Sequence, residues 1–480
     1  MTSIETRPTP AREGPEPARP VASQRYRAVW RWHFYAGIFV APVLLVLAVT
    51  GSIYLFKEPF EEWRYQDVRT LSEPVTRARP LSEQIAAAQR AHPGAPVMSV
   101  IPPMSPDRST RVILQGTETG PFAEGVSVYV HPATAAVLGE VDDGRTFMRV
   151  VRTIHGELMA GTVGDRVVET AACWSLILVA TGTYLWWSTR RRKPGPRRPR
   201  KGRGGLRRVH TWAGAGGGAV VAFLVLSGLP WSGVWGDGLQ RLQDRTGSTY
   251  PSAEDYPHTS GDLSANPDAK VPWAAERLPV PPSEDGHAGH GTTHGVLRDG
   301  ALPLEDALAA ARPAIRSCPP DECDLKILLP DGPKGVYTVV TDPRRDPSDA
   351  QTLHVDQYSG RVLVSYGWNE YGVIAKAVEQ GVALHEGRRY GTANLLLMLG
   401  ACLTLVTLIV TGAWMWWKRR PRGRLGAPAR PTDRRTAYRL IAVMAVLGLL
   451  FPLAGITMAA VLLIDWLVLR RIKPLARLFG

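Results

Sequence analysis

Four long apolar stretches decide what this chain can fold into. Each is 23 to 29 residues long, and about 20 apolar residues are enough for a helix to cross the hydrocarbon core of a bilayer. The polar blocks between them reduce the overall hydrophobic fraction to 45% and so hide them. The sequence therefore predicts a polytopic α-helical membrane protein and excludes a small soluble enzyme. The stretches are residues 28–56, 166–188, 209–236 and 392–417.

The charge distribution indicates how these helices are oriented. Residues 190–208 hold eleven Lys or Arg and no acidic residue, and residues 418–435 hold eight with only Asp433 against them. Together these two segments carry more net positive charge than the +14 of the whole chain. Short basic loops between membrane helices face the cytoplasm, so nucleic-acid binding is not needed to explain them. We expect a multi-pass protein of the inner (cytoplasmic) membrane whose N-terminus is cytoplasmic.

The polar segments complete an expected order of regions. The last apolar segment, 438–469, has Pro452 near its middle. We expect one helix kinked at this proline, because two crossings would have only about 14 residues each, too few for a bilayer. The regions are a disordered cytoplasmic 1–27, span 28–56, external 57–165, span 166–188, basic loop 189–208, span 209–236, external 237–391 with a His/Pro/Gly-rich insertion at 246–300, span 392–417, basic loop 418–437 and span 438–469.

The two halves of the chain repeat one histidine pattern. His33 and His210 each lie in an R-x-H-x-aromatic-A-G motif and are followed 17 residues later by a hydroxyl residue and Gly. His155 and His385 share a Gly at +6, a Thr-Gly pair at +26 and a Trp-Trp pair at +31. A short helix and a pair of alternating strands repeat in the polar blocks. Such matched spacing indicates an internal duplication. The hydroxyl–glycine pairs are Thr50-Gly51, Thr181-Gly182, Ser227-Gly228 and Thr411-Gly412.

These motifs resemble those of the PepSY-associated transmembrane proteins, a family that includes iron-regulated inner-membrane proteins and siderophore-iron reductases. The resemblance covers about residues 25–470 and is most specific in the histidine motifs, with strand pairs of the form V-x-V-x-x-x-x-G-x-V beside them. The sequence departs from the family pattern in the 246–300 insertion and in Ala135, where the first strand turn usually has Gly. The resemblance implies a two-fold internal repeat plus a C-terminal span, with two extracytoplasmic α+β PepSY-like modules. For the reductase members it also implies haem b held by membrane histidines.

The repeated histidines are the predicted haem ligands. By the expected topology His33 and His210 lie at the cytoplasmic boundary, and His155 and His385 lie on the outer side. A six-coordinate haem needs two imidazoles on opposite faces of the iron, which permits the pairs His33–His210 and His155–His385 and excludes a pair across the bilayer. For one isolated histidine an interfacial role is the simpler interpretation, but repetition in register favours ligation of one or two haems. Helix breaks that would return the outer pair toward the membrane are expected near Gly161 and Gly391.

The resulting hypothesis is a transmembrane electron-transfer protein. It would act as a ferric or siderophore-iron reductase that passes electrons through haem b to an external ferric siderophore or ferric ion. The sequence contains no nucleotide-binding or flavin-binding motif, so the electrons must come from a lipid quinol or a partner reductase. The rival hypothesis is a non-enzymatic sensor, anchor or peptidase regulator whose PepSY-like modules bind a partner and whose histidines only pack.

A weaker hypothesis is a metal carrier. His287, His290 and His294 form an H-x2-H-x3-H run in the insertion, and three imidazoles on a loop could hold copper, zinc or ferric ions. A solvated loop is the simpler interpretation, because no carboxylate or cysteine is positioned to complete the site.

The four cysteines do not form a disulfide framework. Cys173 and Cys402 lie inside apolar stretches, where a small buried residue is expected. Cys318 and Cys323 lie in a predicted external segment, where a local disulfide and two free thiols both stay open.

Overall fold

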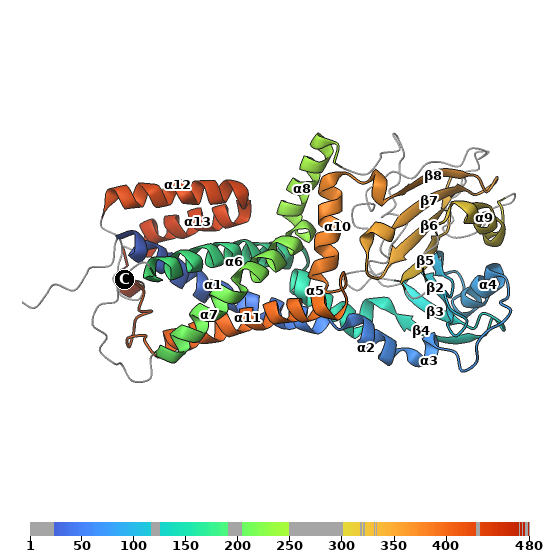
Figure 1. Cartoon of the computed structure of the whole chain (residues 1–480), viewed down its shortest axis with the longest axis horizontal. Coiled ribbons are helices and arrows are strands. Elements are labelled where there is room, and N and C mark those ends of the chain that lie inside the picture. Colours follow the sequence, from blue (N-terminus) through green and yellow to red (C-terminus); the bar gives the residue numbers. More distant parts are fainter. Residues whose placement is uncertain are drawn as a thin grey trace, which may run out of the picture.

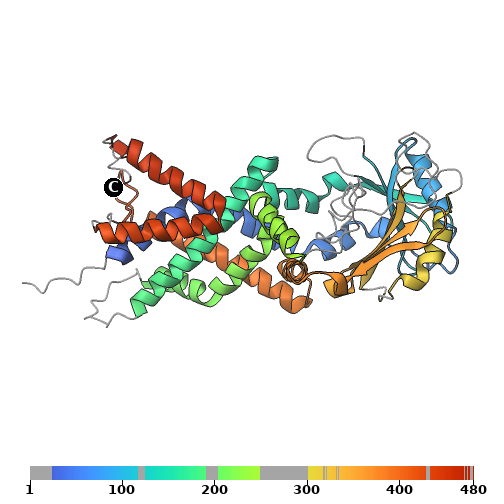
Figure 2. The ribbon, with the colours of Figure 1, turned by 90° about the horizontal axis from the view of Figure 1, so that it is seen from above.

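The structure is a computed structural model with a helical bundle at one end and a β-sheet at the other (Figures 1 and 2). It describes residues 24–116, 125–190, 204–248, 301–316, 319, 322–330, 332, 334–428, 433–469, 471–472, 474–475 and 479.

Four long helices run along the long axis of the molecule and form the bundle (Figure 1). α1 packs against α6 and α11, and α7 packs against the same two helices, so α1 and α7 lie across the bundle from each other. Five helices among the described residues are long and apolar enough to cross a membrane, and these four are among them. The chain is therefore a multi-pass membrane protein, as predicted. The bundle helices are α1 (Gln24–Tyr54), α6 (Gly161–Arg190), α7 (Gly204–Gly228) and α11 (Thr392–Trp417).

Shorter helices stand at the end of the bundle that faces the sheet. α5 is followed by a sharp corner in which Leu158, Met159 and Gly161 all have positive φ angles before α6 begins, and α10 is followed by Gly387 and Gly391 with φ of 74° and 58°. The helix breaks predicted near Gly161 and Gly391 are confirmed. They separate the segments with His155 and His385 from the spans. The short elements are α5 (Phe147–Glu157), α8 (Gly233–Thr246), α10 (Val373–His385) and the 3-10 helices η2 (Leu229–Trp231), η4 (Arg312–Ala314), η5 (Pro347–Asp349) and η6 (Trp368–Glu370).

Both polar blocks contribute to one sheet of eight antiparallel strands. The strand order β4-β3-β2-β1-β5-β6-β7-β8 places the first strands of the two halves side by side at the centre. β1 joins β5 by pairing Ser99 with Leu328 and Val100 with Ile327, so the two halves extend outward in mirrored order. The strands are β1 (Val97–Ile101), β2 (Thr110–Leu114), β3 (Val126–Val130), β4 (Val137–Asp142), β5 (Cys323–Leu328), β6 (Val336–Pro343), β7 (Gln351–Asp356) and β8 (Val362–Gly367).

One face of this sheet is covered by two helices, α4 (Leu81–Ala91) and α9 (Leu304–Ala311). Alternate strand residues such as Val112 and Val339 are fully buried beneath them, and burial of each such side chain stabilises the fold by about 1.5–3 kcal/mol. The outer hairpins turn alike in the two halves, because Ala135 has φ 57° where Gly360 has φ 69°. The departure at Ala135 therefore preserves the turn, although a left-handed conformation costs a residue with a Cβ about 1–2 kcal/mol.

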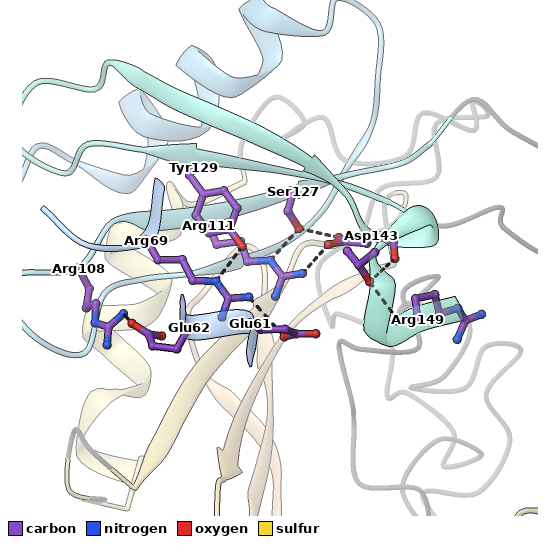
Figure 3. A network of polar contacts seen from close by, with 10 residues as sticks. Glu61, Glu62, Arg69, Arg108, Arg111, Ser127, Tyr129, Asp143 and Arg149 are labelled. Atoms are coloured by element: carbon purple, nitrogen blue, oxygen red, sulfur yellow. Dashed lines mark hydrogen bonds and ion pairs between the residues drawn. The ribbon is translucent and has the colours of Figure 1, made fainter. Parts of the chain in front are cut away.

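Polar side chains anchor the 3-10 helix before α5 to the sheet and join the two short helices that follow α1 (Figure 3). Arg111 on β2 donates to Ser127 on β3 at 2.7 Å and to Asp143 at 2.8 Å. Asp143 is buried in the 3-10 helix η1 (Asp143–Arg145), which leads directly into α5. Nearby, Arg69 pairs with Glu61 at 3.6 Å, which ties α3 (Gln66–Arg69) to α2 (Lys57–Arg64). The segment with His155 is thus fixed at its start by the Arg111–Asp143 ion pair.

The C-terminal apolar segment differs from the prediction. It does not form one kinked helix over 438–469; it forms a hairpin of two helices that converge at Phe451 (Figures 1 and 2). Phe451 has φ −128° and ψ 84°, and Pro452 starts the second helix, a position that suits its fixed φ and missing N–H. Gly448 and Gly455 let the two backbones meet, because a Cβ on Gly455 would lie 2.6 Å from Cα of Gly448. The helices are α12 (Arg434–Leu450) and α13 (Pro452–Ile464), continued by the π-helical turn Asp465–Leu469.

The hairpin returns the chain to the bundle end from which α1 starts. The carbonyl oxygen of Phe479 accepts hydrogen bonds from Arg31 at 2.8 Å and from Tyr35 at 2.7 Å. Arg31 also donates to the carbonyl of Pro428 at 2.6 Å. The described residues after α13, which include Arg471 and Phe479, therefore lie on the same side as the 418–428 loop. A single kinked helix would have put them on the opposite side, against the charge rule.

The hairpin contact gives a prediction for stability. Gly455→Ala adds a methyl group where the two backbones touch, and we expect the free energy of unfolding to fall by about 1–3 kcal/mol. Thermal unfolding of the detergent-solubilised protein measures this. The matched control is Gly400→Ala in α11, where a Cβ meets no atom within 4 Å. Equal melting temperatures for the two variants would contradict the hairpin.

Candidate functional site

Each of the four repeated histidines contacts the hydroxyl of a hydroxyl–glycine pair on another helix. His33 on α1 reaches α6, His155 on α5 reaches α1, His210 on α7 reaches α11, and His385 on α10 reaches α7. The histidine motif and the hydroxyl–glycine motif of the repeat therefore contact each other at four places in the structure. The Nδ1–Oγ distances are 2.9 Å for His33–Thr181, 2.9 Å for His155–Thr50, 3.0 Å for His210–Thr411 and 3.1 Å for His385–Ser227.

The hydroxyl groups decide which ring nitrogen carries the proton. Each hydroxyl donates its one hydrogen to the carbonyl four residues earlier in its own helix, at distances between 2.5 and 2.9 Å. It can then only accept from the imidazole, so Nδ1 carries the hydrogen in the neutral ring. Nδ1 of His385 also donates to the carbonyl of Leu224 at 2.8 Å. Among the described residues no hydrogen bond is made to Nε2 of these four rings, so its lone pair is left available there.

The glycine after each hydroxyl makes room for the ring. A Cβ on Gly51 would lie 3.1 Å from Cε1 of His155, and one on Gly228 would lie 3.0 Å from Cε1 of His385. The corresponding distances are 3.3 Å at Gly182 and 3.6 Å at Gly412. Any larger residue at the first two positions would push the imidazole away from its hydroxyl partner.

The histidines also form two pairs between the halves. Electrostatic interactions link His33 to His210 and His155 to His385. Because α1 and α7 lie across the bundle from each other, His33 and His210 come from opposite sides of the bundle. The second pair lies at the other end of the bundle, since α1 carries His33 near its start and Thr50, the partner of His155, near its end.

The His155–His385 pair is held in the neutral form. Burial lowers the pKa of His155 to about 4, and the charge of His385 contributes to the same shift. Burial also lowers the pKa of His385. Neutral imidazoles with Nδ1–H engaged and Nε2 open are the form in which histidine binds metals.

His287, His290 and His294 lie outside the described residues, and within the described part of the chain no group of three or more His, Cys, Asp or Glu could hold a metal ion.

The cysteines are described in part. Cys173 and Cys402 are buried free thiols, as predicted. Cys323 is disulfide-bonded, and Cys318 lies outside the described residues.

One histidine outside the repeat is fully buried in the sheet. His354 on β7 is fully buried between Thr338 and the Tyr366 hydroxyl, at 3.0 and 3.1 Å. Burial lowers its pKa to about 4. Both ring nitrogens are occupied, so His354 is a structural residue of the sheet.

Sequence reasoning missed the pairing of each histidine with a hydroxyl. The signal was present, because histidines and hydroxyl–glycine pairs repeat with the same offsets in both halves. The offsets did not indicate which helix would supply the partner. That depends on how the bundle closes.

Comparison with known protein families identifies the chain. The family described as the PepSY-associated TM region matches residues 30–419, which include most of α1, the other three bundle helices and the whole sheet. The protein belongs to this family. The resemblance drawn from the histidine motifs is thereby confirmed. A comparison with curated proteins gives no match.

The lowered pKa of His155 gives a prediction for the protein without added cofactor. Below pH 6.5, the ordinary value, the unfolded chain takes up a proton that the folded chain refuses until about pH 4. The free energy of unfolding should therefore fall with decreasing pH in this window, by about 1.4 kcal/mol per unit of pH. His155→Gln should flatten the dependence of the melting temperature between pH 7 and pH 5. Gly400→Ala in α11, which changes no titratable group and where a Cβ meets no atom within 4 Å, should leave it unchanged, and an equal slope in both variants would contradict the assignment.

Proposed function

We propose that this protein transfers electrons across a cell membrane through haem b, with one haem between His33 and His210 and a second between His155 and His385. In this proposal the two halves of the sheet are PepSY-like modules outside the cytoplasm, and the basic loops and N-terminus are cytoplasmic. The acceptor is a ferric siderophore or another ferric chelate used in iron uptake. The donor is a membrane quinol or a partner reductase.

The observation that carries this proposal is the fixed tautomer of four repeated histidines. An axial haem ligand donates through Nε2 while its Nδ1–H is held by a hydrogen-bond acceptor, which orients the ring and raises its basicity. All four histidines have this arrangement, and each ring rests against a glycine that leaves it close to its hydroxyl partner. Purely structural histidines, such as His354, use both nitrogens for hydrogen bonds to the protein.

Haem would supply the one-electron redox chemistry at its iron. The chain's residues would hold the two ligand pairs near opposite ends of the bundle, separated by the 17 residues from His33 to Thr50, about 25 Å of helix. The apolar helices exclude water between the pairs. This placement would let electrons enter from one side of the membrane and leave on the other.

The sheet region offers a place for the acceptor to dock. An open pocket of about 750 Å³ lies beside α2, α3 and the β3–β4 hairpin, within the range of about 300–1,000 Å³ found for small-molecule sites. Its lining combines carboxylates, hydroxyls and an exposed indole. The lining residues are Glu62, Trp63, Gln66, Asp67, Thr70, Leu71, Ser72, His131 and Leu138. Phe60 contacts both Trp63 and Phe147, the first residue of α5, with ring centroids 5.9 and 5.2 Å apart. An aromatic row therefore leads from the pocket toward the helix with His155.

Optical spectroscopy of the purified protein tests the proposal. We expect a Soret band and two haems per chain by the pyridine haemochrome assay. His33→Ala or His210→Ala should remove one haem, and His155→Ala or His385→Ala the other, because each haem loses one axial ligand. The surface variant His92→Ala is the control. Wild-type protein that binds no haem after reconstitution would leave the sensor or anchor hypothesis instead.

The hydroxyl partners give a second prediction, for the redox potential. Thr181→Val removes one acceptor of the His33 imidazole and leaves the backbone hydrogen bond at Leu178. The imidazole becomes less basic, so the potential of that haem should rise by an amount on the order of tens of millivolts. Spectroelectrochemical titration measures it. The matched control is Thr183→Val on the same helix, whose hydroxyl bonds only the carbonyl of Val179 at 2.8 Å. Equal potentials in the two variants would contradict a role for the hydroxyl.

A further inference from the structure

The corner between α7 and α8 is held by a carboxylate from the other half of the chain. Glu169 on α6 accepts from the backbone N–H groups of Val234 and Trp235 at 2.9 and 3.0 Å. These are among the first N–H groups of α8, which have no partner within the helix. The Glu169 side chain is completely buried. It therefore acts as an N-terminal cap supplied by a neighbouring helix, where the helix dipole also favours a negative charge.

Two neighbours of Glu169 complete the contact. Asp165 accepts from the N–H of Gly233 at 3.3 Å, and Arg166 pairs with Asp165 at 2.6 Å and with Glu169 at 3.7 Å. The guanidinium of Arg166 occupies the space beside Gly233, because a Cβ there would lie 1.6 Å from Nη1. Three successive N–H groups at the start of α8 are thus bound by one face of α6.

This corner sets the surroundings of His385. Between α7 and α8 the chain passes through η2, and the indole of Trp231 in η2 lies edge-on to the His385 ring with centroids 5.8 Å apart. Ser227, the hydroxyl partner of His385, is four residues before Trp231. Movement of the start of α8 would therefore move both neighbours of this imidazole.

The buried carboxylate of Glu169 has no counterpart in the second half of the repeat. Glu169 lies fourteen residues after His155, and the residue fourteen after His385 is Leu399. The second half thus has a leucine where the first has a buried carboxylate. Burial of a carboxylate is energetically unfavourable unless a specific partner compensates for the lost water. For Glu169 that partner is the start of α8.

We propose that Glu169 is a positioning residue of the His155–His385 site: it fixes the start of α8 and so holds Trp231 and Ser227 around His385. The inference rests on the proposed function only for the identity of the ligand at the His155–His385 site, which is haem. The contacts that it concerns are those of the protein alone, so they can be tested without haem.

The experiment compares Glu169→Leu, which copies the second half, with Glu169→Gln, which keeps one acceptor oxygen. A nitroxide spin label on Leu242→Cys, at a half-exposed position of α8, reports whether α8 is held. Cys173 and Cys402 are buried, so the introduced thiol is labelled selectively. The rate of carbethoxylation of His385 by diethyl pyrocarbonate, read by mass spectrometry on protein without haem, reports the position of the ring, with His33 and His210 as internal controls.

We expect the mobile fraction of the label and the His385 rate both to rise several-fold in Glu169→Leu and less in Glu169→Gln. The control Glu83→Leu, at an exposed carboxylate of α4, should change neither. A mobile label with an unchanged His385 rate would overturn the positioning role, and so would no change in either. Loss of the proposed function would show separately, as wild-type protein without a Soret band, while both readouts would still decide the role of Glu169.

Discussion

The packing of the helical bundle and the orientation of its four repeated histidines depend on one small relay of hydrogen bonds, which occurs four times. A threonine or serine hydroxyl gives its hydrogen to a carbonyl of its own helix and accepts the Nδ1 hydrogen of a histidine on another helix. In an apolar bundle an unsatisfied polar group is costly, so this relay both joins the helices and orients the rings. The proposed haem sites follow from it, because the relay uses one ring nitrogen and leaves the other.

Duplication explains why the sites come in pairs. In the bundle, the first helices of the two halves, α1 and α7, alternate with the second helices, α6 and α11. In the sheet, the strands of the two halves meet at the centre, where β1 pairs with β5. Residues in the same position of each half are thereby brought to the same end of the molecule. A repeat that is linear in the chain becomes a facing pair in space.

The halves have diverged where the chain needed only one copy of a contact. Glu169 caps α8 across the halves, whereas the second half has Leu399 at the equivalent offset. The C-terminal hairpin packs on one side of the bundle through Trp174, which donates to Thr457 at 2.9 Å. Such single contacts distinguish the two ends and the two sides of an otherwise repeated structure.

The sequence by itself determined the four helices of the bundle, the duplicated motifs, the family and the helix breaks, because apolar length, spacing and glycine placement are local properties of the chain. It did not determine that 438–469 folds as a hairpin, since a proline inside an apolar run is compatible with a kink or a new helix, and only the approach of Gly448 to Gly455 selects the second. Nor did it reveal which hydroxyl meets which histidine, or that Glu169 caps α8. Those contacts join residues 65 to 201 positions apart, and they exist only once the helices have packed.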